Sequence, residues 1–131
     1  MKRTEMKSRY RNTGPSRDVV EVVLERDQYS CFVCGLGLGP QRGTDFQIHH
    51  RRARRQGGSQ LGDTNMPQNL LLLDPSCHAR IEKERTAAYE GGWLVRQEGN
   101  PLEVEVLRHA LEWVLLQEDG SVRVVRPVEA S

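Results

Sequence analysis

The sequence predicts an α+β fold in which two strands precede a helix and further strands follow it. Residues 46–53 and 69–73 are typical of strands, and the stretch between them is rich in Gly, Asn, Asp and Pro. A helix is expected after Asp74, because aspartate is a good N-cap and Pro75 fits the first helical position. The central part of the chain is therefore expected to run β, β, α.

Elements on both sides complete this expectation. Ser16 can cap a short amphipathic helix whose apolar residues recur at helical spacing up to about Asp27. The central helix should continue to about Tyr89 and stop at Gly91-Gly92. Short strands are then expected over 93–96, 104–107, 112–116 and 122–125, and the last two should form a hairpin at Asp119-Gly120.

A chain of 131 residues has the usual size of one compact domain. We divide it into a flexible basic arm (1–15), a central unit (16–90) and a C-terminal β-strand extension packed on that unit (91–131). Residues 1–17 carry six Lys or Arg against Glu5 alone, which favours contact with phosphates. No apolar run approaches the roughly 18 residues of a spanning helix, so we expect a cytoplasmic protein without a membrane partner.

Cysteines and arginines add two candidate sites. Three cysteines cannot pair completely, so Cys31, Cys34 and Cys77 are interpreted as metal ligands or buried thiols. A basic cluster follows the first expected strand and is interpreted as a phosphate contact, the alternative being a solvated face. It consists of Arg51, Arg52, Arg54 and Arg55.

Three of the four histidines fall in the β, β, α segment, and His49 and His50 are adjacent. Neighbouring side chains on a regular strand point to opposite faces, so the strand must end, bulge or twist if both are to serve one site. Asn69 is suited to hold such a distortion, because its amide can bond a backbone group.

These residues occur in an order that resembles the HNH endonuclease family, over roughly residues 31–84. The sequence looks closest to the small HNH proteins of bacteriophages and actinobacteria, and the stretches at 92–95 and 113–120 resemble the C-terminal extension of those proteins. The motifs that carry the resemblance are Cys31-x-x-Cys34, Ile48-His49-His50-Arg51, Gly57-Gly58-Ser59, Asn69 with four leucines after it, and Cys77-His78.

The resemblance implies a ββα-metal core that hydrolyses DNA phosphodiester bonds, by nicking or by double-strand cleavage. His49 and His78 would bind one catalytic divalent ion, His50 would be the general base, and Asn69 would orient the site. Imidazole is a base suited to neutral pH, and a cation stabilises charge on phosphate oxygens. The ion is expected to be Mg²⁺, Mn²⁺, Ni²⁺ or Zn²⁺.

The family also implies a structural zinc site formed by two Cys-x-x-Cys pairs. Here the position of the fourth cysteine is Asp74, which either coordinates through oxygen or leaves the site incomplete. Cys77 and His78 diverge by about 100° on a helix and should therefore serve different ions. Glu82 lies on the face of His78, but an exposed ion pair with Arg85 is its expected role.

Two functions from different classes remain open at this point. The first is the metal-dependent DNA endonuclease. The second is a non-catalytic zinc-knuckle protein that binds DNA or acts as an accessory, for example with a phage terminase or another packaging protein in a bacterial host cell. The aspartate at position 74 keeps this second function open.

Overall fold

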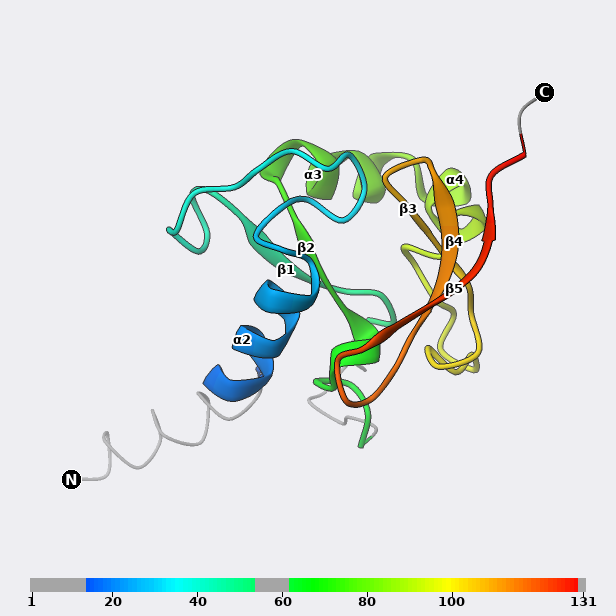
Figure 1. The fold of residues 1–131 in the computed structure, drawn as a ribbon, viewed down its shortest axis with the longest axis horizontal. Helices are drawn as coiled ribbons and strands as arrows, with labels where there is room; N and C mark the ends of the chain where they lie inside the picture. The colour runs from blue at the N-terminus through cyan, green and yellow to red at the C-terminus, as the bar shows by residue number, and fades with distance from the viewer. Residues whose placement is uncertain (1–13, 54–61, 130–131) are drawn as a thin grey trace.

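The structure is a computed structural model that describes residues 14–53 and 62–129. Within these ranges it is an α+β fold with two small antiparallel sheets (Figure 1), as the sequence predicts. Its elements are α2 (Arg17–Arg26), β1 (Gln47–His50), the 3-10 helix η2 (Pro67–Asn69), β2 (Leu70–Leu73), α3 (Pro75–Lys83), α4 (Arg85–Glu90), β3 (Val106–Arg108), β4 (Glu112–Leu116) and β5 (Val122–Pro127).

Strands β1 and β2 form the first sheet, and α3 begins one residue after β2. His49 lies opposite Leu71 and His50 opposite Leu70 in this antiparallel pair. All four leucines of β2 are buried because its two faces contact different apolar clusters. Leu71 and Leu73 pack in a cluster with Phe32 and Ile81, whereas Leu70 and Leu72 pack with Val23 and Phe46.

Helix α2 begins as expected at Ser16, whose side chain accepts a hydrogen bond from the amide of Val19 at 3.2 Å. Its last residue, Arg26, forms a buried ion pair with Asp27. These two side chains fasten the helix to β2, since Arg26 donates to the carbonyl of Leu70 and Asp27 accepts from the amide of Leu72. The orientation of α2 is thus set by polar contacts as well as by apolar packing.

The expectation of one continuous helix from 75 to 89 is wrong. Glu84 adopts φ −118° and ψ 64°, which ends α3 and allows α4 to begin in a new direction. Ile81 from α3 and Ala88 from α4 then reach the same apolar cluster. The break thus lets both helices contribute a buried residue to one core, which residue spacing within 75–89 does not reveal.

Strands β3, β4 and β5 form the second sheet, and the Asp119-Gly120 hairpin joins β4 to β5 as expected. The amide of Gln117 donates to the carbonyl of Ser121, and Gly120 has φ 89°, which glycine adopts without strain. The expected strand over 93–96 is wrong, because these residues form a bend and irregular backbone. The amide of Val95 bonds instead to the carbonyl of Arg51, just beyond β1.

Several expectations concern residues outside the described ranges. They include most of the basic arm, Arg54, Arg55 and the Gly57-Gly58-Ser59 motif. Over the part of the chain that is described, no helix is both long enough and apolar enough to cross a bilayer.

Candidate functional site

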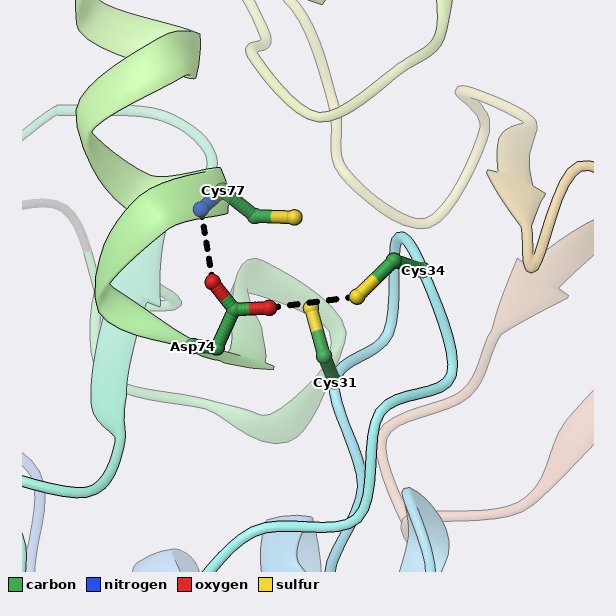
Figure 2. A group of neighbouring side chains, drawn as sticks. All are labelled: Cys31, Cys34, Asp74 and Cys77. Atoms are coloured by element: carbon green, nitrogen blue, oxygen red, sulfur yellow. Dashed lines mark hydrogen bonds between the residues drawn. The ribbon is translucent and has the colours of Figure 1, made fainter.

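The side chains of Cys31, Cys34, Asp74 and Cys77 converge on one point between the loop after α2 and the start of α3 (Figure 2). One potential ligand atom from each residue lies within 4.8 Å of the others. Cys34 is exposed, whereas the other three are buried. Three sulfur atoms and a carboxylate oxygen at this spacing could hold a metal ion.

Local backbone geometry brings the first two cysteines together. The amide of Gly35 donates to the carbonyl of Cys31 at 2.8 Å, and the amide of Cys31 donates to the carbonyl of Leu36 at 2.8 Å. Gly35 has φ 82°, a backbone conformation that residues with a side chain rarely adopt. The amide of Phe32 bonds to the carbonyl of Leu72, so this turn is held directly against β2.

Asp74 is both the N-cap of α3 and a member of the cluster. Its Oδ1 accepts from the amide of Cys77 at 2.8 Å, and its Oδ2 accepts from the Sγ of Cys34 at 3.1 Å. Burial acts to raise the pKa of Asp74, but hydrogen bonds from the Cys77 amide and the cysteine thiols outweigh it and lower that pKa. The capping interaction therefore leaves one carboxylate oxygen directed at the sulfur atoms.

The thiols of Cys34 and Cys77 disfavour ionisation when no cation is near. Burial is the largest cause that raises the pKa of Cys34 and of Cys77, and the neighbouring Cys31 adds to it in both. A bound cation would favour the thiolate forms, because its charge offsets the repulsion among the four acidic groups. The donor set thus fits a soft or borderline divalent ion.

A second group of residues, the histidine pocket, lies between β1, α3, α4 and the segment after α4. The cavity has a volume of about 270 Å³ and is open to solvent. The rings of His49 and His78 meet edge to face, with their centroids 5.4 Å apart. The residues that line the pocket are Ile48, His49, His50, Ala53, His78, Glu82, Arg85 and Leu94.

His49 and His50 both line this pocket although both are regularly paired in β1, so the expected distortion between them is absent from the strand pairing. The strand ends directly after His50. His78 also lies in the pocket while its neighbour Cys77 lies in the cysteine cluster. The two residues therefore point to different sites, as the helical spacing predicts.

The ring of His49 is held in one tautomer. Its Nε2 lies 2.7 Å from the carbonyl oxygen of Trp93, which can only accept, so Nε2 carries the proton and Nδ1 the lone pair. Burial, helped by the charges of His78, His50 and Arg51, lowers the pKa of His49 to about 4 against the opposing effect of the Trp93 bond. A neutral imidazole oriented by a backbone carbonyl has the form that metal ligands take.

His50 is oriented by a residue that sequence reasoning missed. Its Nε2 lies 2.8 Å from the Oδ1 of Asn65, an arrangement in which Nε2 donates and Nδ1 carries the ring's lone pair. Asn65 belongs to the long Gly- and Asn-rich stretch before β2, where no spacing distinguishes one polar residue from another. Only the three-dimensional path of that loop identifies it.

Asn69 fixes the backbone where the chain leaves β1. Its Oδ1 accepts from the amide of Arg52 at 2.8 Å, while its Nδ2 donates to the carbonyls of Arg52 at 3.1 Å and Thr64 at 2.8 Å. The side chain is fully buried, so each of these bonds is shielded from water. The contact to a backbone group expected from the sequence is thus present.

Arg51 and Arg52 do not form the expected phosphate-binding surface. Arg51 is 0% exposed, and its guanidinium donates to the carbonyls of Gln68, Gly92, Pro101 and Val104. Arg52 is 4% exposed and donates to the carbonyl of Gly99 and the carboxylate of Asp63. The acceptor carbonyls lie outside the strands of both sheets, and the two guanidinium groups supply them with donors, so both arginines are structural.

Glu82 and Arg85 form the expected ion pair, with the Nη1 of Arg85 3.1 Å from the Oε1 of Glu82. Both side chains also line the histidine pocket, so this pair belongs to its rim. The sequence indicates only the pairing of Arg85 with Glu82, and its place beside the pocket is apparent only in the structure.

Apart from Asn69 and the two buried arginines, the predicted site residues that the structure describes form two groups. The cysteine cluster could hold a metal ion, and the histidine pocket brings three imidazoles to one opening. No protein-family model, curated protein or solved structure matches the chain.

Proposed function

We propose that the protein is a metal-dependent endonuclease of the HNH type that hydrolyses DNA phosphodiester bonds. One observation carries the proposal: His49, His50 and His78 line a single pocket formed by a β-strand pair and the helix that follows it. The residue order that resembles the HNH family adds support from the sequence. Exposed backbone phosphates fit a solvent-open pocket of this kind.

Each histidine has a distinct proposed role. His49, neutral and oriented by Trp93, and His78 would hold the divalent ion, and His50 accepts the proton of the attacking water through Nδ1. When bound, the ion supplies positive charge that stabilises the phosphate oxygens and the leaving oxygen. Asn69 keeps the backbone after β1 in the position that directs both histidines to one opening.

We also propose that Cys31, Cys34, Cys77 and Asp74 hold a structural zinc ion. Thiolate ligands favour zinc among the common divalent ions, and a carboxylate oxygen is an accepted fourth ligand. Zinc here would join the loop after α2 to the first turn of α3, directly beside His78. The structural ion would thus stabilise the helix that carries one ligand of the catalytic ion.

The purified full chain is expected to nick supercoiled plasmid DNA when Mg²⁺, Mn²⁺ or Ni²⁺ is added, and EDTA should stop the reaction. His78→Ala should lower the nicking rate by about 10²-fold or more, because one of few ligands of the ion is lost. The matched control is His109→Asn, which removes the remaining histidine at a position where φ is 54° and asparagine is tolerated. Gel separation of supercoiled and open-circular plasmid measures the rates.

His109→Asn should nick like the parent. If His78→Ala nicks as fast as the parent, and the parent nicks as fast in EDTA as with added metal, the proposed catalytic site is wrong. DNA binding by the parent without cleavage under any of these metals would favour the non-catalytic accessory function instead.

The zinc proposal makes a separate prediction about metal content. The parent should carry about one equivalent of zinc, and Cys31→Ser should carry less than about half, because a buried sulfur ligand is removed. His78→Ala is the control, since it should keep its zinc while it loses nicking. Elemental analysis of the purified proteins checks both, and a zinc content below half an equivalent that Cys31→Ser does not change would contradict the proposal.

A further inference from the structure

We propose that Arg85 and Arg96, which both stack on the ring of Tyr89, form a phosphate-binding rim for the DNA backbone beside the histidine pocket. This inference rests on the proposed function for its choice of substrate. It assigns contact with the DNA backbone to one residue of α4 and one residue of the segment after α4. In the basic cluster expected beyond β1, Arg51 and Arg52 are buried and do not make this contact.

The position of the rim is fixed at two points. Arg85, the first residue of α4, lines the histidine pocket together with His78. Leu94 lines the same pocket from the segment that carries Arg96, two residues further along. The side chain of Gln97 donates to the carbonyl of Ala53, another lining residue, at 2.8 Å. Arg96 therefore lies in a segment that is attached to the pocket on both sides.

The two guanidinium groups are oriented by the aromatic ring. The Cζ of Arg96 lies 4.3 Å from the centroid of the Tyr89 ring, and that of Arg85 lies 5.8 Å from it. Arg85 also donates to the hydroxyl of Tyr89 at 3.4 Å and to Glu82 at 3.1 Å. Stacking holds a guanidinium plane in place and leaves N–H groups at its edge for the oxygens of a phosphate.

The charge at this rim suits a polyanion. Arg85 and Arg96 are both exposed, and over residues 14–53 and 62–129 no carboxylate pairs with Arg96. Among the described residues that line the pocket, Glu82 is the one carboxylate, and Arg85 neutralises it. Bidentate contact of arginine with phosphate is strong because both partners are charged and planar donors match the phosphate oxygens.

Arg51 and Arg52 are not available for contact with DNA phosphates, so other residues must supply it. Arg51 directs its guanidinium to four carbonyls and Arg52 to a carbonyl and a carboxylate, so neither presents donors to a ligand. Arg85, in the lining of the pocket, and Arg96, on the adjoining segment, are both exposed and present donors to solvent.

The test is binding of a short fluorescein-labelled DNA duplex, followed by anisotropy over a series of salt concentrations without added divalent ion. The variants are Arg85→Gln, Arg96→Gln and the double variant. Arg123→Gln on β5 is the matched control, because it removes the same charge from an exposed residue outside the pocket lining. Zinc content and circular dichroism should be unchanged in all of them, since the exchanged side chains are exposed.

Each single exchange at the rim should weaken binding by about tenfold and make the slope of log K against log salt shallower by about 0.9. Arg96→Lys should keep the slope, because the charge is retained, while it loses the planar stack. Arg123→Gln should bind like the parent.

Two outcomes overturn the proposal in distinguishable ways. If the parent binds and nicks DNA while the rim variants match Arg123→Gln within about twofold at every salt concentration, the rim proposal alone is wrong. If the parent neither binds nor nicks DNA, the proposed function is wrong and the rim proposal with it.

Discussion

Replacing His50 with alanine is expected to lower the rate of plasmid nicking by about 10²–10⁴-fold, the usual contribution of a positioned general base. His50 lines the open pocket at the end of β1 and is partly exposed, so its loss should leave little unfilled space in the apolar clusters. The effect should therefore fall on proton transfer, with the fold and the zinc content preserved.

Single-turnover nicking with excess protein measures this step apart from product release. Added imidazole should restore part of the rate in His50→Ala, because a free base can enter a pocket that is open to solvent. It should not accelerate His78→Ala to the same extent, since that variant lacks a ligand and not a base. If His50→Ala nicks as fast as the parent at matched folding, the assignment of the general base is wrong.

Replacing Arg51 with methionine is expected to lower the free energy of unfolding by about 3–5 kcal/mol. The change leaves four carbonyls, those of Gln68, Gly92, Pro101 and Val104, without the donors that the buried guanidinium supplies. Each buried acceptor that loses its partner costs about 1–3 kcal/mol, and apolar contacts of the methionine offset part of the sum. Burial, with a smaller effect of Arg26, lowers the pKa of Arg51 to about 9, so the side chain is still charged at neutral pH.

Urea denaturation followed by tryptophan fluorescence measures the effect, with Arg123→Met as the exposed control. Arg51→Lys should lose less than Arg51→Met, because an ammonium group keeps the charge and up to three donors. This second variant keeps the prediction testable if Arg51→Met does not fold. A change of less than about 1 kcal/mol in Arg51→Met would contradict the structural role.

The sequence predicts what depends on local order along the chain. Ser16 and Asp74 cap their helices, Asp119-Gly120 forms its hairpin, and the β, β, α order is present. Cys77 and His78 point to different sites, because helical spacing alone separates their directions. Such features are set within a few residues and require no knowledge of distant contacts.

Features that depend on distant contacts were predicted wrongly or not at all. Arg51 and Arg52 belong to a basic run that suggests a surface, yet carbonyls some 40 to 50 residues later in the sequence bind their guanidinium groups. The break at Glu84 accompanies the packing of Ile81 and Ala88 in one apolar cluster, and the irregular path over 93–96 accompanies amide bonds to the carbonyls of Ala88 and Arg51. Asn65 and the carbonyl of Trp93 orient His50 and His49 through contacts that no short motif contains.

The contacts of Arg51 and His49 also bear on how this chain can be divided. The two sheets share no strand pairing, which makes the end of α4 look like a point where a module could be exchanged. Yet three of the four acceptors of Arg51 and the acceptor of His49 lie beyond residue 90. Exchange of either part alone at that point would separate donors from acceptors, so the residues on both sides of it form one cooperative unit on which the histidine pocket depends.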